Sequence, residues 1–489
     1  MKKSDFLLQN MVDPKTGAEA RKLPQYVAAL SVCLGAVAAG AVLGWTSNIS
    51  DALLDGKFND IAIDQDILGW ISSFTTLGAM VICFPMGIVC DLLGRKLACL
   101  LTIIPFSGGW LLIILSNGEI MLYAGRFLVG FAGGAFCVAA PIYTSEIAQK
   151  EIRGTLGGYF QLLLTVGILF AYVFGSICTP LVLSILCACI PLVFGVVFFF
   201  QPETPVYSLK KGDRASALAS LRKLRGQRYD CESELKELQE QIDKDVAVKV
   251  PFSEAVRTKA ARKAILICFG LMIFQQLSGV NAVIFYTGQI FKEAGGSIPP
   301  NYATIGIGIV QVVATFISTV VVDKFGRRIL LMASAFCMAL SGAALGVFFT
   351  LKDRHVVSED VVNTIGFLPV VSLVVFITMF SLGFGPIPWM ASAEIMPPEI
   401  KSTAVSAAAT FNWLLAFLVT RFYNNLVDAT GGDVTFYLFA AISLLGTFNV
   451  FFFVPETKGK SIQEVQDMLN GHKPGPTTKE GIDNPNFKH

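Results

Sequence analysis

Twelve stretches of about 20 mainly apolar residues follow one another along the 489-residue chain. They cover residues 25–47, 67–90, 97–116, 120–142, 155–178, 181–200, 264–290, 303–322, 329–350, 365–392, 402–425 and 434–454. Charged residues make up only 15% of the chain and its mean hydropathy is +0.62, whereas a soluble protein carries about 25% charge. The sequence therefore predicts an all-α membrane protein with twelve transmembrane helices in a lipid bilayer.

The charged and metal-binding residue types exclude several classes of function. The net charge is only +2, and no basic run of the kind that follows a phosphate backbone is present, so we expect no nucleic-acid partner. All three histidines lie in polar segments, and most of the 11 cysteines lie in apolar stretches, where a thiol behaves as a small buried hydrophobe. No nucleophile, base or metal cluster is visible, so we expect no enzyme activity, no metal and no cofactor.

One long polar insert separates the first six apolar stretches from the last six. The predicted organisation is a cytoplasmic N-terminus (1–24), a six-helix half (25–202), a cytoplasmic helical insert (203–263), a second six-helix half (264–454) and a cytoplasmic tail (455–489). Within the insert, residues 231–245 have the pattern of an amphipathic helix. This helix is expected to lie on the membrane domain or, alternatively, to offer a coiled-coil partner site.

Basic residues concentrate on one side of the predicted membrane. All but six of the 38 Lys and Arg residues lie in the N-terminus, alternate loops, the insert and the tail; the exceptions are Lys57, Arg126, Lys292, Lys352, Arg354 and Arg421. Because basic loops stay in the cytoplasm, we expect a multi-pass plasma-membrane protein with both termini cytoplasmic. The first outer loop then carries the sequon Asn48-Ile49-Ser50, which makes Asn48 a candidate glycosylation site.

Three local patterns occur once in each half. Asp91-Leu-Leu-Gly-Arg95-Lys96 returns as Asp323-Lys-Phe-Gly-Arg327-Arg328, Glu146 with Arg153 returns as Glu394 with Lys401, and Pro202-Glu203-Thr204 returns as Pro455-Glu456-Thr457. The patterns keep the same order, and each lies at the cytoplasmic end of the corresponding stretch. They predict two homologous halves that give alternating access to a site between them.

These repeats and several further motifs resemble the sugar porter family of the major facilitator superfamily over about residues 25–460. The further motifs are Gly125-Arg126-Phe127, Gln275-Gln276-Leu-Ser-Gly-Val-Asn281 and Gly385-Pro386-Ile387-Pro388-Trp389. Residues 282–287 and 381–385 are most similar to the insect facilitated trehalose and hexose transporters. The resemblance implies the major facilitator fold with two pseudo-symmetric six-helix halves, a neutral sugar substrate and a monomeric state.

Six amide side chains lie within the apolar stretches: Gln161, Gln275, Gln276, Asn281, Gln311 and Asn412. Each must meet another helix, a water-filled cavity or a ligand, and joining helices is the simpler alternative. On a regular helix Gln275, Gln276 and Asn281 would point in three directions. A break at Ser278-Gly279 would let them converge on a cavity, where a primary amide can both donate to and accept from sugar hydroxyls.

Trp389 follows two prolines in the tenth stretch. An indole there can pack on the C–H face of a sugar ring or, alternatively, belong to an interfacial aromatic belt. The resemblance implies that Gln161, Gln275, Gln276, Asn281, Trp389 and Asn412 match sugar-contacting positions, and that Gln311 matches a position usually occupied by Asn.

The resemblance also implies a latch of charged residues at the cytoplasmic ends of both halves: Asp91, Arg95, Glu146, Arg153, Asp323, Arg327, Arg328, Glu394 and Lys401. In the family these charges bridge the halves when the site opens outward and part when it opens inward. Lys401 stands where most members have Arg, which would lose the fork geometry of a guanidinium. Arg126 is expected to anchor helix packing.

No Asp or Glu lies in the middle of a stretch, and Thr46 stands near the position where related proton symporters carry an acidic residue. Facilitative uniport of a sugar is therefore the favoured function. Trehalose is the leading substrate on resemblance alone, and Ser381 replaces a Glu of typical glucose carriers. The alternatives are a facilitative glucose or hexose carrier, a proton-coupled sugar symporter and a non-transporting sugar receptor.

Overall fold

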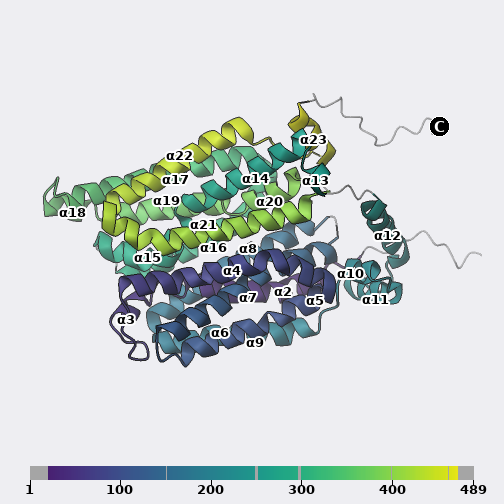
Figure 1. Ribbon diagram of the computed structural model, residues 1–489, viewed down its shortest axis with the longest axis horizontal. Helices are drawn as coiled ribbons and strands as arrows, with labels where there is room; N and C mark the ends of the chain where they lie inside the picture. Colours follow the sequence, from purple (N-terminus) through teal and green to yellow (C-terminus); the bar gives the residue numbers. More distant parts are fainter. Residues whose placement is uncertain are drawn as a thin grey trace, which may run out of the picture.

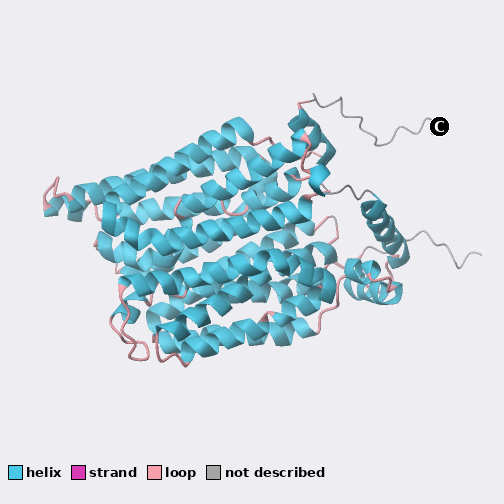
Figure 2. Ribbon diagram, in the orientation of Figure 1, coloured by secondary structure: helices cyan, strands magenta, loops and turns pink. Residues whose placement is uncertain are grey.

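The computed structural model describes residues 20–149, 151–247, 252–295, 299–397, 399–460 and 462–471. The regular structure of these residues is entirely helical (Figure 2). Twelve segments are long and apolar enough to cross a membrane, which confirms the predicted number. Parts of the predicted N-terminus and tail, residues 1–19 and 472–489, lie outside the described residues.

The spans agree with the predicted stretches within a few residues at most ends. In chain order they are α2 (Leu23–Gly44), α4 (Gln65–Leu93), α5 with α6 (Arg95–Leu101 and Ile103–Ile114), α7 (Glu119–Ile147), α8 (Arg153–Ile177), α9 (Pro180–Phe199), α14 with α15 (Lys259–Leu277 and Val280–Ala294), α16 (Pro300–Phe325), α17 (Arg327–Asp353), α19 with α20 (Leu368–Leu382 and Ile387–Ile395), α21 (Lys401–Thr430) and α22 (Gly432–Phe453). Short helices α3 (Ser50–Leu54) and α18 (Glu359–Thr364) lie in loops.

The spans form two bundles of six that lie against each other (Figure 1). Helices α2 to α9 build the N-terminal half, and α14 to α22 build the C-terminal half. Across the boundary, α4 packs against α21 and α8 packs against α16. The predicted arrangement of two six-helix halves is therefore confirmed.

Small residues let the helices within a half approach closely. A Cβ atom on Gly130 of α7 would lie 2.0 Å from the backbone oxygen of Thr75 in α4, and one on Gly167 of α8 would lie 2.2 Å from that of Val37 in α2. Because apolar side chains gain little from leaving lipid for a protein interior, such close van der Waals packing stabilises helix pairs in membranes.

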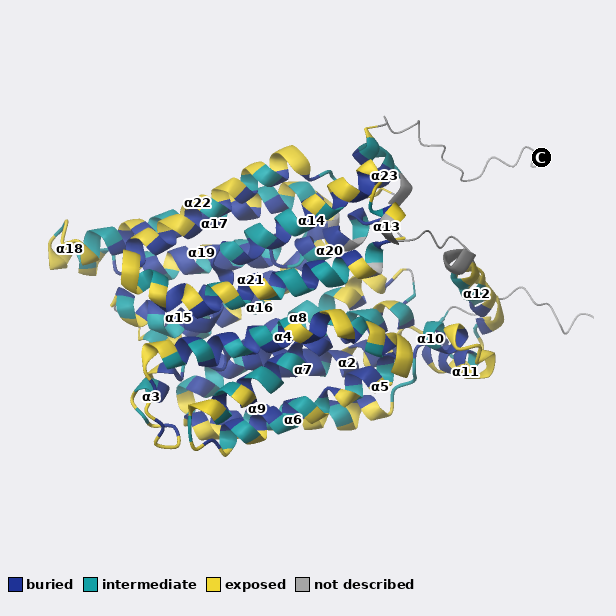
Figure 3. Ribbon diagram, in the orientation of Figure 1, coloured by how far each residue is buried: buried dark blue, intermediate teal, exposed yellow. Residues whose placement is uncertain are grey.

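The outer surfaces of both halves carry large apolar side chains, as a lipid-facing surface requires. Ile104 is 68% exposed, Phe200 69% and Leu266 72%. Figure 3 shows exposed residues along the outer helices and buried residues where helices face one another.

The insert forms a small cluster at one end of the bundle, which we name the insert end (Figure 1). The cluster contains α10 (Pro205–Lys210), α11 (Arg214–Arg225) and α12 (Cys231–Ala247). Helices α13 (Phe252–Ala255) and α23 (Ile462–Asn470) lie at the same end, next to the C-terminal half. The predicted amphipathic helix is confirmed as α12, but its apolar face packs against α10 and α11 rather than on the membrane domain. Leucines of α10 and α11 cover the apolar face of α12. We name the opposite end of the bundle the far end.

Candidate substrate site

The seventh and tenth spans are both interrupted. Helix α14 ends at Leu277 and α15 begins at Val280, because Gly279 has a φ of +88° and a Cβ there would lie 2.5 Å from the Phe439 ring. The break predicted at Ser278-Gly279 is therefore present. Helix α19 ends at Leu382 and α20 begins only at Ile387.

Four of the predicted site amides form one hydrogen-bonded chain at these breaks. The Asn281 amide donates to Gln276 Oε1, Gln276 Nε2 donates to Asn412 Oδ1 at 2.9 Å, and Asn412 Nδ2 donates to Gln275 Oε1 at 2.7 Å. Gln275 Nε2 then donates to the backbone oxygens of Phe384 (2.7 Å) and Gly385 (2.9 Å). The break brings together amides that a regular helix would spread around its circumference.

Gln275 has a second role that the sequence did not indicate. The interruption between α19 and α20 frees backbone carbonyls that a continuous helix would satisfy. The Gln275 amide satisfies two of them, and it is itself only 2% exposed. The seventh span therefore holds the shape of the tenth.

The remaining predicted site residues lie elsewhere around the boundary of the halves. Gln161 is half-buried on α8, and Gln311 is 2% exposed on α16, the helix that α8 packs against. The side chains of these two make no hydrogen bond to another described residue. Trp389, on α20, is half-buried and packs on the core of the C-terminal half. The structure joins four of the seven residues directly and leaves the amides of two others available.

A small cavity lies inside the C-terminal half, beside the break in the seventh span. It is lined by Ser278, Ser341, Ser372 and the rings of Phe376, Phe436 and Phe439. It has room for about one water molecule, so it does not fit a sugar.

The predicted latch residues of the N-terminal half form a clamp at the insert end. Arg95, only 3% exposed, pairs with Asp91 and Glu146 at 3.0 Å each. Thr204 Oγ1 donates to Glu146 at 2.6 Å, and Glu203 accepts the backbone N–H of Lys96 at 2.9 Å. Glu203 therefore caps the first turn of α5, where a carboxylate is favoured.

The C-terminal half repeats this clamp. Arg327 pairs with Glu394 at 3.2 Å, Thr457 donates to Glu394, and Glu456 accepts the backbone N–H groups of Arg327 (3.0 Å) and Arg328 (3.1 Å). Glu203 and Glu456 were not predicted as functional residues, although the repeated Pro-Glu-Thr pattern was the signal that marked them.

The two capping glutamates differ in acidity. Burial raises the pKa of Glu203, and the backbone N–H groups of Thr204 and Lys96 offset this only in part. Burial also acts to raise the pKa of Glu456, but N–H groups from Lys458, Arg327, Arg328 and Thr457 outweigh it, and that pKa is lowered.

The ion pairs that Arg95 forms with Asp91 and Glu146, and Arg327 with Glu394, lie within one half each. Arg153 is exposed and donates to the Ala148 backbone oxygen at 3.4 Å, and the Arg328 guanidinium lies 5.6 Å from the centre of the Phe451 ring. Lys401 begins α21 and lies near the Glu394 carboxylate of the same half. The side chain of Asp323 lies outside the described residues. Arg126 does not join the latch, because it is fully buried within the N-terminal half.

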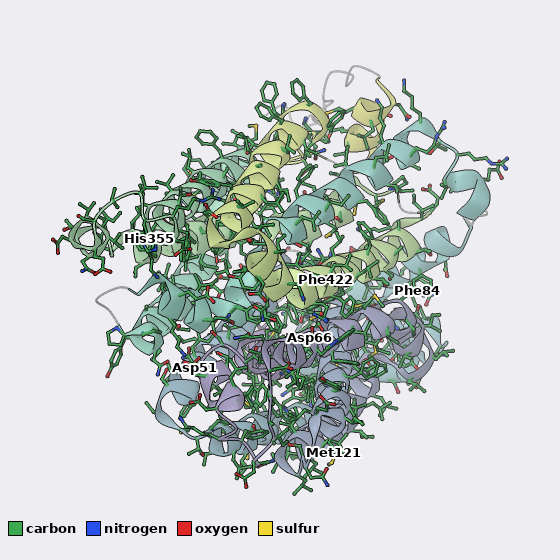
Figure 4. All side chains as sticks on the ribbon, turned by 60° about the vertical axis from the view of Figure 1, so that its left-hand side comes forward. Asp51, Asp66, Phe84, Met121, His355 and Phe422 are labelled. Carbon is green, nitrogen blue, oxygen red and sulfur yellow. The ribbon has the colours of Figure 1, made fainter. Side chains whose placement is uncertain are left out.

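The halves are joined instead at the far end. Arg421 of α21 pairs with Asp66 of α4 at 2.6 Å and lies 4.4 Å from the centre of the Trp70 ring. Lys292 pairs with Asp51 at 2.9 Å. Figure 4 labels Asp51 and Asp66 on the N-terminal half, and Asp66 lies at its boundary with the yellow-green helix α21. Sequence analysis did not predict this contact, because no local pattern links residues 355 positions apart.

Hydrogen bonds to backbone groups also join the two halves. Tyr172 of α8 donates to the backbone oxygen of Ile284 at 2.7 Å, and the Gly288 N–H donates to Ser47 Oγ at 3.3 Å. The second half of the seventh span, α15, is thereby held against the N-terminal half.

The side chain of the candidate glycosylation site, Asn48, makes two hydrogen bonds within the N-terminal half. Asn48 Nδ2 donates to the backbone oxygen of Tyr172 at 2.7 Å and to Ser176 Oγ at 2.8 Å. A glycan on this nitrogen would have to replace the contacts that join the turn after α2 to α8, and glycosylation of Asn48 stays a prediction.

The family described as "Sugar (and other) transporter" matches residues 23–469. The chain belongs to this sugar transporter family. It is 38% identical over 463 residues to the facilitated trehalose transporter Tret1-2 homolog of Drosophila sechellia, with 94% of each chain covered. It is 39% identical over 448 residues to the facilitated trehalose transporter Tret1 of Drosophila erecta, covering 91% of this chain but 52% of that relative. The chain thus spans about half the length of that relative.

Solved structures share the fold of this sugar transporter. The xylose transporter XylE from E. coli in an inward open conformation has a TM-score of 0.74 at 20% identity, covering 91% of this chain and 99% of that one. The proton:xylose symporter XylE of the major facilitator superfamily, bound to 6-bromo-6-deoxy-D-glucose, has a TM-score of 0.70 at 22% identity, covering 90% and 99%. The major facilitator fold is confirmed, and the chain is a multi-pass membrane transporter of sugars rather than an enzyme.

Proposed function

We propose that this sugar transporter is a facilitative uniporter whose leading substrate is trehalose. The observation that carries the proposal is the chain of four neutral amides formed by Gln275, Gln276, Asn281 and Asn412. Two of them come before the break in the seventh span, one comes after it, and the fourth is on α21. Amides match sugar hydroxyls as donors and acceptors without the desolvation cost of a charge. The choice of trehalose rests on the relatives named facilitated trehalose transporters.

The placement of acidic residues supports uniport over proton coupling. The carboxylates of the described spans lie near helix ends, as Asp91, Glu146 and Glu394 do. Thr46 is 1% exposed close to the end of α2, where a hydroxyl carries no titratable proton at physiological pH. No acid within the described spans is therefore placed to couple a proton to sugar movement.

The contacts between the halves support alternating access. We assign the insert end, with both termini, to the cytoplasm, and the protein to the plasma membrane as a monomer. The ion pairs Arg421–Asp66 and Lys292–Asp51 then close the outer side. Arg95–Glu146 and Arg327–Glu394 stay within their halves, the arrangement expected when the site faces inward.

Gln161, Gln311 and Trp389 complete the proposed site. Sugar binding would engage the free amides of the first two and would place a ring against the indole. Without sugar, the amides of the chain satisfy one another. When sugar binds, part of this internal hydrogen bonding is replaced by contacts to the sugar hydroxyls.

Counterflow in proteoliposomes tests this function. Proteoliposomes that contain the purified full-length protein are loaded with unlabelled trehalose, glucose or xylose. Uptake of labelled trehalose and, in parallel, of labelled glucose is followed with and without a protonophore. We expect counterflow of trehalose driven best by trehalose and unchanged by the protonophore. Accumulation that collapses on uncoupling would establish symport, and uptake of labelled glucose without uptake of labelled trehalose would establish a hexose carrier.

A pair of variants tests the site. Gln276→Ala should reduce uptake at least about tenfold, since it removes a donor and an acceptor from the amide chain. Gln239→Ala is the matched control, because Gln239 lies on α12 and its amide contacts only Asp243. Equal uptake by the two variants at equal abundance would show that the amide chain does not bind the sugar.

A further inference from the structure

Arg126 is a fully buried cation without a carboxylate partner. Its Nε donates to the backbone oxygen of Ile71 at 3.1 Å and its Nη1 donates to that of Val42 at 3.0 Å. Its guanidinium lies 5.0 Å from the centre of the Trp45 ring. These partners are all neutral, and the ion pairs formed among described residues do not include Arg126.

No neighbouring group supplies the missing negative charge. The titratable groups that interact with Arg126 are the Cys187 thiol and the Tyr286 hydroxyl, which are both buried and neutral at pH 7. A guanidinium does not lose its proton in a protein. A single buried charge is strongly unfavourable unless another charge compensates it.

Several buried polar groups without a hydrogen-bond partner lie on Arg126 itself and on the two segments that contact it. The Arg126 Nη2 group and the hydroxyls of Thr46, Ser72 and Thr75 are buried and have no hydrogen-bond partner. Thr46 lies one helical turn beyond Val42, while Ser72 and Thr75 lie next to and one turn beyond Ile71. The backbone oxygens of Val42 and Ile71 thus bring the segments that carry these hydroxyls against Arg126.

We propose that a small monovalent inorganic anion, chloride in a physiological salt solution, binds beside Arg126. The guanidinium supplies the charge, and the hydroxyls of Thr46, just after α2, and of α4 supply further donors, which is the arrangement that favours anions. Arg126 lies seven residues from the start of α7, about 10 Å into the bundle from the far end. The anion neutralises the buried cation and joins α2, α4 and α7 as a fixed structural ion.

Chloride binding is measured on the purified full-length protein. The melting temperature is compared in sodium chloride and sodium gluconate at equal ionic strength, and retention of ³⁶Cl⁻ is measured by equilibrium dialysis. We expect a saturable rise in melting temperature with chloride, and about one chloride per chain, the number that neutralises one guanidinium. Equal melting in both salts with no retained chloride would overturn the proposal, since water alone would then occupy the site.

Two variants of Thr46 locate the effect. Thr46→Asp supplies a fixed carboxylate beside the guanidinium, so the variant should lose chloride retention and melt at the same temperature in both salts. Thr46→Asn, which is similar in size and uncharged, should keep the chloride response. If Thr46→Asp retains chloride like the parent protein, the ion binds elsewhere and the proposal fails. Neither measurement uses sugar, so this result is independent of the proposed substrate.

Discussion

Corresponding spans of the two halves differ in one respect that defines the site. The first and fourth spans, α2 (Leu23–Gly44) and α7 (Glu119–Ile147), are each one continuous helix. Their counterparts in the C-terminal half, the seventh and tenth spans, are broken at Ser278–Gly279 and between Leu382 and Ile387. The amide chain lies at these two breaks, whereas the clamps at the insert end are built alike in both halves.

This difference separates what the halves share from what each contributes. A duplicated scaffold supplies helix packing and the Pro-Glu-Thr clamps to both halves. The C-terminal half adds irregular backbone, which a membrane protein tolerates only where protein or a water-filled cavity satisfies it. The N-terminal half contributes continuous first and fourth spans and a fully buried cation, Arg126, that pairs with no carboxylate among the described residues. We infer that the C-terminal half holds the sugar while the N-terminal half is the rigid body against which it moves.

The largest loss of stability and of uptake is expected from a substitution at the break of the seventh span, where the first span is continuous. Gly279→Ala places a Cβ 2.5 Å from the Phe439 ring at a φ of +88°. Left-handed strain and overpacking together should destabilise the protein by about 3 kcal/mol and abolish uptake. Gly157→Ala is the control, since nothing lies within 4 Å of its Cβ position, and it should be neutral or slightly stabilising. Thermal unfolding and surface abundance measure both, and equal values would show that the break does not require Gly279.

The next largest loss of stability is expected at the clamps, and it should differ between the two halves. The side chain of Glu146 is 14% exposed beside an Arg95 that is 3% exposed, whereas Glu394 is 32% exposed beside Arg327. Glu146→Gln should cost about 3 kcal/mol, because it leaves a buried guanidinium with only the exposed Asp91 as partner. Glu394→Gln should cost about 1 kcal/mol, since solvent screens the more open pair. Chemical unfolding of both variants checks the order, and a reversed order would mean that exposure does not set the strength of the clamps.

A smaller loss of stability is expected when the hydrogen bonds from Gln275 to the break in the tenth span are removed. Gln275→Leu removes the donor to the Phe384 and Gly385 carbonyls and should destabilise the protein by about 2 kcal/mol. Gln161→Leu should change stability by less than about 0.5 kcal/mol, because the Gln161 side chain makes no hydrogen bond to described residues. Both variants should reduce sugar uptake. Similar unfolding of the two would indicate that other contacts hold the tenth span.

Length and periodicity were enough to predict the twelve spans, and the repeated motifs were enough to predict the two halves. The break at Ser278-Gly279 followed from Gln275, Gln276 and Asn281, which otherwise point apart. The use of Gln275 as a cap for Phe384 and the pairing of Asp66 with Arg421 could not be predicted, because each joins segments more than 100 residues apart. The latch residues were identified, but one sequence encodes every state of the transport cycle. The sequence alone therefore could not predict that these residues pair within each half in the state that the structure describes.

The smallest effect concerns acidity at the clamps, and its sign differs between the halves. The pKa of Glu203 is raised, so the folded protein gains stability as pH falls through that pKa toward the ordinary value near 4.3. The pKa of Glu456 is lowered, so its contribution is present above the ordinary value and is lost as pH falls through the lowered pKa. Melting temperatures of Glu203→Gln and Glu456→Gln are compared with the parent protein between pH 7 and about pH 3, which extends below the ordinary pKa of a glutamate. The difference between Glu203→Gln and the parent should become more unfavourable on acidification, and that for Glu456→Gln less unfavourable. Parallel pH profiles would show that the two capping carboxyl groups titrate alike, and that the duplicated clamps do not differ electrostatically.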